Sequence, residues 1–380
     1  MSCPTPRLDA TGLLVFPMLL LLACSADSPT APAAVRAAGR ADVIQPAATT
    51  TVVMSGLDAP KGLAWGPDGS LYVVESGTAT IAGPCAEVVR GQNCYSGTGA
   101  ISRLRGGVQE RVASGLPSAY NPAIADFIGP SDIEFVGLGK AMVTIGWGGD
   151  PTARSGLGDL GSLFGTLIQV QPSGHWKVVA DVTGFEGANN PQGGPFDSNP
   201  YGVMAEPGNT YVTDAGGNSL LRVRNNGSVS LVATFAQIPV PLGPFNPPFA
   251  LSDAVPTEVR RGPDGALYVS LLTGVPFLPG AASIMRVVPG QAPTVHEGGF
   301  ALITDFDWGP DGSLYVLQYA SAPFLGGPGQ LIKVAPNGTR TVITTDLLHS
   351  TGVLVGTDGA IYVSVNGNVP AVGQVLRIVP

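Results

Sequence analysis

The chain has 380 residues, of which 12% are charged and 44% are hydrophobic, and its formal net charge is −8. An acidic chain that lacks a basic patch with interleaved aromatic residues excludes nucleic acid as a partner. About 330 residues remain once the N-terminal leader is set aside, which is enough for one closed domain and leaves none for a second.

Residues 1–23 have the pattern of a secretory signal peptide. Arg7 precedes an apolar stretch, Leu13–Leu22, that is too short to remain as a membrane anchor. The sequence Leu21-Leu22-Ala23-Cys24 resembles the lipobox of bacterial lipoproteins. This resemblance implies diacylation of Cys24 and a mature protein that is tethered to a membrane by lipid alone.

The residues after Cys24 extend this interpretation. Ser25 resembles the signal that sorts lipoproteins to the outer membrane, where the protein would face the periplasm or the surface of the cell envelope. Residues 24–47 are rich in Ala, Pro and Ser and predict a flexible tether. An ordinary secretory signal, cleaved nearby, is the alternative.

Residues 48–57 contain an isolated strand pattern, Thr50–Met54, that belongs to none of the repeats that follow it. The last repeat has only three strand patterns before the chain ends at Pro380. We therefore predict that residues 48–57 supply the missing outermost strand of the last blade and close the ring.

Six similar units follow, each with a strand, a tight turn, and a second strand that usually starts with an aromatic residue and a valine. Gly, Pro and Asn suit the turns, and the β-branched and aromatic residues between them suit buried strands. Two further strands complete each unit. Four-stranded antiparallel sheets with two apolar faces must stack on one another, so residues 48–380 predict an all-β, six-bladed β-propeller. The six turns are Asp68-Gly69, Gly139-Lys140, Pro207-Gly208, Asp264-Gly265, Asp311-Gly312 and Asp358-Gly359.

Two cysteines remain outside the leader, Cys85 and Cys94, in one loop of the first repeat. An exported chain folds in an oxidising compartment, so we expect a local disulfide between them. Metal ligation is the alternative, but no histidine lies nearby in the sequence.

The short turns should all lie on one face of the propeller, which leaves the variable loops on the other, the loop face. Function tends to reside on such loops above a rigid scaffold. The innermost strands begin on the loop face. Counting from Pro60, Pro130, Pro200, Pro256, Ile303 and Ser350, the third position on is apolar in every repeat, and the second position on lies on the opposite side of the strand. These second positions are Gly62, Asp132, Gly202, Glu258, Asp305 and Gly352.

Three acids at the mouth of a central channel repel one another unless a proton or a cation neutralises them. Asp132, Glu258 and Asp305 are therefore candidate ligands for Ca²⁺, which prefers oxygen ligands. Glu75 and Asp214 return to the same face and are candidate ligand-binding residues, as is His349 before the last inner strand. The alternative is that the acids cap strand ends, pair with Lys61 or Arg260, or contact channel water.

The repeat Gly66-Pro67-Asp68-Gly69-Ser70-Leu71-Tyr72-Val73 with a later Leu-x-Arg-Val strand resembles NHL-like and gluconolactonase-like propellers. The order of motifs over about residues 50 to 380 looks most like the ScyD/ScyE family of exported propellers: residues 59–69, a cysteine-containing first loop, Asn199–Gly202 and Pro256–Val259. The resemblance implies six blades and export, and supplies no catalytic set.

Our leading functional hypothesis is a monomeric, lipid-anchored envelope propeller that binds a small molecule, a glycan or an envelope protein through its loop face, without catalysis. The alternative is a Ca²⁺-dependent lactonase or similar hydrolase at the channel mouth. A quinone-dependent sugar dehydrogenase is a weaker third hypothesis, because no cluster of arginines and histidines would hold the anionic cofactor.

Overall fold

The computed structural model describes residues 43–44, 48–137, 139–240 and 251–380, all of which belong to one compact unit, Gly39–Pro380. The predicted signal peptide, Cys24 and all of the tether except Val43 and Ile44 lie outside the described residues. Within the described part, neither helix is long and apolar enough to cross a membrane.

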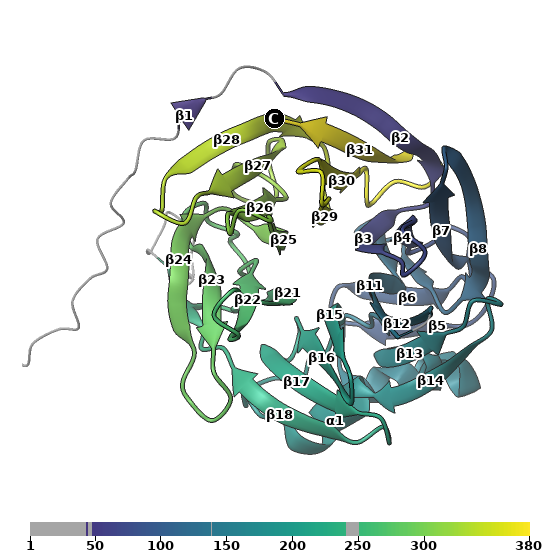
Figure 1. Ribbon diagram of the computed structural model, residues 1–380. Helices are drawn as coiled ribbons and strands as arrows, with labels where there is room; N and C mark the ends of the chain where they lie inside the picture. Colours follow the sequence, from purple (N-terminus) through teal and green to yellow (C-terminus); the bar gives the residue numbers. More distant parts are fainter. Residues whose placement is uncertain (1–42, 45–47, 138, 241–250) are drawn as a thin grey trace, which may run out of the picture. The chain divides into compact units, whose positions relative to one another are not determined.

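Six sheets carry the six repeats, and they follow one another around a central axis in the order of the sequence (Figure 1). Sheet 1 contains β3 (Pro60–Trp65), β4 (Leu71–Glu75), β7 (Gly99–Arg105) and β8 (Val108–Leu116). Sheet 2 contains β11 (Pro130–Val136), β12 (Lys140–Ile145), β13 (Thr166–Val170) and β14 (Trp176–Asp181). Sheet 3 contains β15 (Pro200–Glu206), β16 (Asn209–Asp214), β17 (Ser219–Arg224) and β18 (Val229–Thr234).

The second half continues the pattern. Sheet 4 contains β21 (Pro256–Arg261), β22 (Leu267–Leu271), β23 (Ala282–Val287) and β24 (Thr294–Phe300). Sheet 5 contains β25 (Ile303–Trp308), β26 (Leu314–Gln318), β27 (Gly329–Val334) and β28 (Arg340–Leu347), and β1 (Val43–Ile44) runs parallel to β28. Sheet 6 contains β29 (Gly352–Val355), β30 (Ile361–Val365) and β31 (Gly373–Val379). The prediction of an all-β propeller is confirmed.

The N-terminal strand β2 (Thr49–Leu57) pairs antiparallel with β31, from Thr49 opposite Val379 to Leu57 opposite Gly373. Met54 and Leu57 are fully buried in this pairing. The strand order of sheet 6 is therefore β2-β31-β30-β29, with both ends of the domain in one sheet. How much this pairing stabilises the ring stays a prediction.

The core lies between adjacent sheets. In every inner strand, the apolar residue that follows the acid or glycine position is at most 1% exposed, as the alternation in the sequence predicts: Leu63, Ile133, Val203, Val259, Phe306 and Val353. The inner strands contact one another in the cyclic order β3, β11, β15, β21, β25, β29 and again β3.

A hydroxyl group crosses each junction between neighbouring sheets and donates to a main-chain carbonyl of the next inner strand. Inner-strand backbone near the axis would otherwise be buried with unpaired acceptors. The six donor and acceptor pairs are Ser76 and Pro130, Thr144 and Tyr201, Thr213 and Thr257, Thr257 and Ile303, Thr304 and Ser350, and Thr351 and Pro60.

The loops of the first repeats hold more structure than we expected. β5 (Cys85–Val88), β6 (Gly91–Tyr95), β9 (Ala119–Asn121) and β10 (Asp126–Ile128) form an additional four-stranded sheet. A 3₁₀ segment (Pro151–Leu163) and α1 (Val182–Asn189) occupy later loops, and β19 (Ile238–Pro239) pairs with β20 (Leu251–Ser252).

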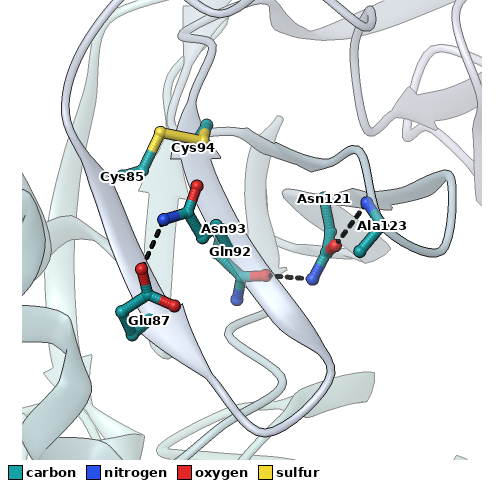
Figure 2. Close-up of a disulfide and its surroundings, with 7 residues drawn as sticks. All are labelled: Cys85, Glu87, Gln92, Asn93, Cys94, Asn121 and Ala123. Carbon is teal, nitrogen blue, oxygen red and sulfur yellow. Dashed lines mark hydrogen bonds between the residues drawn. A yellow bond between two sulfur atoms is a disulfide. The ribbon is translucent and has the colours of Figure 1, made fainter.

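The predicted disulfide is confirmed and joins facing residues of the β5–β6 hairpin (Figure 2). Its Cα atoms are 3.9 Å apart. The adjacent Asn93 is buried, accepts a hydrogen bond from Asn121 and donates one to the carbonyl of Trp147 at 2.8 Å. The disulfide therefore supports a hairpin that is attached to sheet 2.

Candidate functional site

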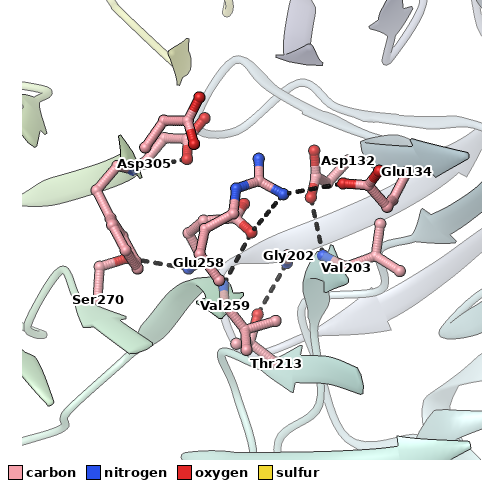
Figure 3. Close-up of polar contacts among 12 residues, drawn as sticks. Asp132, Glu134, Gly202, Val203, Thr213, Glu258, Val259, Ser270 and Asp305 are labelled. Carbon is pink, nitrogen blue, oxygen red and sulfur yellow. Dashed lines mark hydrogen bonds and ion pairs between the residues drawn. The ribbon is translucent and has the colours of Figure 1, made fainter. Parts of the chain in front are cut away.

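Asp132, Glu258 and Asp305 lie near the starts of β11, β21 and β25 and are each at most 2% exposed (Figure 3). The pairing of each of these strands with its neighbour has a register shift at this point. Such bulges redirect side chains locally. The strand positions of the three acids match the sequence prediction, but all three are buried rather than exposed at a mouth.

The three carboxylates accept hydrogen bonds from the main chain. Asp132 Oδ2 accepts from the N–H of Val203 at 2.8 Å, and Asp305 Oδ2 accepts from the N–H of Val353 at 2.7 Å. Both bonds reach the inner strand of the following sheet. Glu258 Oε1 instead accepts from the N–H of the next residue, Val259, at 2.8 Å. These acids therefore connect and cap inner strands.

The three glycines at equivalent positions have a packing role. A Cβ atom on Gly62 would lie 1.9 Å from Asp132 Oδ1, and one on Gly202 would lie 2.3 Å from the carbonyl oxygen of Thr257. On Gly352 it would lie 2.5 Å from the carbonyl oxygen of Lys61. These positions need glycine because a neighbouring inner strand approaches closely.

Arg260 is the cation nearest to the three acids. Its Nη1 lies 3.4 Å from Glu258 Oε1 and 3.3 Å from Glu134 Oε2, and its side chain is only 10% exposed. It also acts electrostatically on Asp132 and Asp305. Arg260 Nη2 and Asp132 Oδ1 are buried without a hydrogen-bond partner.

Burial raises the pKa of Asp132, Glu258 and Asp305, and the positive charge of Arg260 opposes this rise. Burial also raises the pKa of Glu134 to about 7 and the pKa of Asp307. Burial and mutual repulsion therefore favour the protonated forms of these five acids, and the guanidinium of Arg260 favours their charged forms.

The sequence left a metal and ordinary pairing as alternatives for these acids. Among the described residues, no group of three or more His, Cys, Asp and Glu side chains is arranged to hold a metal ion. The structure shows pairing of Glu258 with Arg260, and the Ca²⁺ site stays a prediction. Lys61, the other proposed partner, interacts electrostatically with Asp126 instead.

Glu75 lies at the end of β4, away from the three acids, and is fully buried. It accepts hydrogen bonds from the N–H of Asp58 at 2.7 Å, from Ser102 Oγ at 2.6 Å and from Arg111 Nη2 at 2.6 Å. This set satisfies the carboxylate from within the protein. Its proposed ligand role stays a prediction.

Asp214 ends β16 and has a comparable set of partners. It accepts from the N–H of Asn199 at 2.6 Å, from the N–H of Gly217 at 3.0 Å and from Ser198 Oγ at 2.7 Å. Burial raises its pKa to about 6. Like Glu75, it fixes the segment that enters its own sheet, and its ligand role also stays a prediction.

Glu186, on α1, was missed by sequence reasoning. It is 1% exposed, and its Oε2 atom has no hydrogen-bond partner. A Cβ atom on Gly217 would lie 2.8 Å from this oxygen and 3.1 Å from Asp214 Oδ2, which places the two carboxyl groups near each other. Burial raises the pKa of Glu186 to about 7, and the charges of Asp214 and Asp197 add to the effect.

Five half-buried side chains form a group at the loop-face end of the channel, which we call the mouth cluster: Lys61, Asp126, Tyr201, Tyr319 and His349. Lys61 and Tyr201 directly precede Gly62 and Gly202 on their inner strands. The charges of Asp305, Asp132 and Asp126 all act on the Tyr201 hydroxyl. The rings of Tyr319 and His349 are 5.8 Å apart.

Burial favours the neutral forms of Lys61, His349 and Tyr319. It lowers the pKa of Lys61 and of His349, and it raises the pKa of Tyr319 to about 12. Of these five residues, the sequence marked only His349 as ligand-binding. Lys61 and Tyr201 could have been found in the sequence, because each directly precedes one of the inner-strand positions that hold an acid or a glycine.

No protein-family model matches this sequence, and no curated protein matches it. Solved structures match over most of the chain. A protein of unknown function from Bacteroides thetaiotaomicron is 10% identical, with a TM-score of 0.51, over 88% of this chain and 76% of that chain. Regucalcin, a calcium-binding protein from Agrobacterium tumefaciens, is 12% identical, with a TM-score of 0.49, over 89% and 96%. A putative glucose dehydrogenase from Thermus thermophilus is 19% identical, with a TM-score of 0.45, over 87% and 100%. At these identities the similarity shows the β-propeller fold alone.

Proposed function

We propose that this protein is an exported, lipid-anchored β-propeller that binds a small hydroxylated molecule or a glycan at the mouth cluster, without catalysis. One observation carries the proposal: Lys61 and Tyr201, from different sheets, both interact electrostatically with Asp126, and the rings of Tyr319 and His349 are 5.8 Å apart. Sites for small ligands combine such apolar surfaces with a few convergent polar groups.

The residues below the mouth cluster support binding rather than catalysis. Asp132 and Asp305 already accept main-chain hydrogen bonds, and Glu258 faces Arg260. A general base must lie within reach of the substrate, and all three carboxylates are at most 2% exposed. His349 is in contact with the Tyr319 ring, and burial disfavours its charged form by lowering its pKa.

A hydroxylated ligand suits the charge of the site. The amine of Lys61 is balanced by Asp126, and the acids beneath have raised pKa values, so the site has no large excess of either charge. The rings of Tyr201, Tyr319 and His349 offer apolar faces, and their polar atoms offer hydrogen bonds. Both features match a sugar-like molecule.

Export and anchoring rest on the sequence. The lipobox-like Leu21–Cys24 and the resemblance to the ScyD/ScyE family support an outer-membrane lipoprotein of the cell envelope. Cys24→Ala should move the protein from the membrane fraction to the soluble envelope fraction and abolish its labelling by a fatty acid. Membrane retention of the unlabelled variant would contradict a lipid anchor.

The binding site is tested by calorimetric titration of the purified protein with glucose, gluconate and short glucans. Lys61→Met should weaken binding of whichever compound binds by about tenfold, which is the effect of one lost polar contact of about 1.4 kcal/mol. Lys140→Met changes an exposed lysine on β12 and is the control. Equal affinity in Lys61→Met and Tyr201→Phe would exclude the mouth cluster.

The Ca²⁺-dependent hydrolase is the alternative, favoured by the unpartnered and buried Asp132 Oδ1. Thermal unfolding in EDTA and across a calcium titration separates the two functions. A ligand present at one hundred times its Kd adds about 2.7 kcal/mol to the stability of the state that binds it. We expect no calcium-dependent shift. A shift that Asp132→Ala abolishes would favour the hydrolase.

A further inference from the structure

Two pockets lie on the face that carries the tight turns, opposite to the mouth cluster. The first, of about 240 Å³, lies between sheets 4 and 5, next to the turn residues Pro263 and Gly312. The second, of about 320 Å³, lies between sheets 6 and 1, next to the turn residues Gly69 and Thr357. Sequence reasoning had assigned function to the loop face only.

Both pockets have the same construction. A tryptophan from the end of an inner strand packs against the tyrosine of the preceding sheet. Trp308 meets Tyr268 with ring centroids 5.2 Å apart, and Trp65 meets Tyr362 at 5.1 Å. Both pairs are edge to face, at 81° and 89°. The pockets therefore arise from the repeat itself, wherever an aromatic residue ends the inner strand and the turns leave space above it.

The first pocket has a third ring. His296, on β24, lies 4.8 Å from the Tyr268 ring and 6.2 Å from the Trp308 ring. His296 is exposed and Trp308 is half-buried, so both offer ring surface to a ligand, whereas Tyr268 is only 4% exposed. Leu314 and Val334 add further apolar lining.

The polar groups at this pocket are carboxylates that are already neutralised. Asp264 pairs with Arg286 at 2.7 Å, and Glu297 pairs with Arg340 at 3.0 Å. A cationic ligand would therefore meet no uncompensated negative charge. A carboxylate in such a pair keeps acceptor capacity, because it has about four lone-pair directions. It can accept hydrogen bonds from ligand hydroxyls.

The size of the pocket restricts the ligand. A volume of about 240 Å³ exceeds the ~150 Å³ of a cavity that holds benzene. It is smaller than the ~300–1,000 Å³ typical of drug-sized ligands. One ring with substituents is the unit that fits. Aromatic walls require that this ring have apolar faces, and the carboxylates require hydroxyl groups at its edge.

We propose that the pocket formed by Tyr268, His296 and Trp308 binds a single pyranose unit of a neutral glycan. The sugar ring lies against the exposed faces of His296 and Trp308, and its hydroxyls donate to Asp264 and Glu297. The proposal does not depend on the mouth cluster, since the two sites lie on opposite faces and share no residue. The anchored protein would then contact a glycan through its turn face while its loop face binds another ligand.

Affinity electrophoresis of the purified protein in gels that contain dextran, mannan, galactan or soluble chitosaccharide tests the proposal. The wild-type protein should be retarded by at least one of these polysaccharides. His296→Ala should raise the dissociation constant about two- to thirteenfold, as expected for the loss of one aromatic contact. The side chain is exposed, so this variant should unfold at the wild-type temperature.

His175→Ala is the matched control, because His175 is an exposed histidine in the β13–β14 turn and lines neither pocket. It should bind like the wild type. Retardation by none of the four polysaccharides would overturn the proposal. So would equal retardation of His296→Ala and the wild type.

Discussion

Replacing Arg260 by Met should destabilise the propeller in a way that depends on pH. Among the residues that the structure describes, Arg260 is the cation that interacts with Asp132, Glu258 and Asp305 together. Its removal leaves several buried acids that must either be charged without a counter-ion or bind protons. Methionine keeps much of the side-chain volume, so the change mainly removes charge.

The size of the effect follows from the burial of the pair. Removing one partner of a buried ion pair costs about 3–5 kcal/mol. Unfolding entropy of about 2.1 cal/mol/K per residue, summed over roughly 340 residues, makes 1 kcal/mol equivalent to about 1.4 °C in Tm. We therefore expect Arg260→Met to lower the Tm by about 4–7 °C at pH 8.

The sign of the pH dependence can be stated. Because burial raises the pKa of the three acids above the values of the unfolded chain, the native state binds more protons above about pH 4. Stability therefore falls as pH rises. Without Arg260 these pKa values rise further, so the variant should lose stability more steeply than the wild type and approach it at pH 5.

The assay is thermal unfolding of both proteins from pH 5 to pH 8, with Arg261→Met as the control. Arg261 is the next residue but pairs with Glu206 at the surface, where such pairs are worth about 0–1 kcal/mol. The double variant Arg260→Met, Glu258→Gln should recover part of the loss. An equal loss at pH 5 and pH 8 would refute the reasoning and would mean that Arg260 acts through packing.

Three further predictions follow from the same geometry. Gly62→Ala should lower the Tm by several degrees, because its Cβ atom would overlap Asp132 Oδ1. Gly298→Ala is the control and should change the Tm little, because its Cβ atom would have no neighbour closer than 3.7 Å. Similar effects of the two variants in thermal unfolding would contradict the packing role of Gly62. Burial raises the pKa of Glu186 to about 7, so the native state holds this proton at pH values where the unfolded chain has lost it. Glu186→Gln should therefore weaken the fall in stability between about pH 4.5 and pH 7. An unchanged pH profile in chemical denaturation would show that the Glu186 carboxyl group does not contribute to the pH dependence. Deletion of residues 49–57 should lower the Tm by well over 5 °C, because it removes the buried Met54 and leaves β31 without its neighbouring strand. An unaltered melting temperature would mean that this strand does not hold the ring.

The repeat predicted the fold well because it encodes both the tight turns and the alternation of residues between the two sides of each strand. Each Asp-Gly or related turn is followed by a strand whose inward residues are apolar, and the apolar residue after the acid or glycine position is buried in all six inner strands, as predicted. The alternation also placed Asp132, Glu258 and Asp305 correctly on their strands. These features depend on neighbours along the chain, which a single sequence shows directly.

The partners of those acids depend on contacts between distant segments. Asp132 bonds to Val203 and lies over Gly62, which are far from it in sequence. The sequence suggested Arg260 only as one possible partner, because a strand position does not tell whether a long side chain turns toward the axis. The additional sheet of β5, β6, β9 and β10 was missed for a similar reason: its strands are short, and two loops combine to form it.

One local arrangement explains why the two faces of this propeller differ chemically. On the loop face, five of the six inner strands begin with a bulge, and polar residues such as Lys61 and Tyr201 lie at these bulges beside buried acids. On the turn face, inner strands end in residues such as Trp65 and Trp308 that pack against the tyrosine of the preceding repeat. A polar residue at the start of the strand and an aromatic residue at its end therefore give a polar cluster on one face and aromatic pockets on the other. Substitutions at strand starts should change only ligands of the mouth cluster, and substitutions around the strand ends should change only glycan binding.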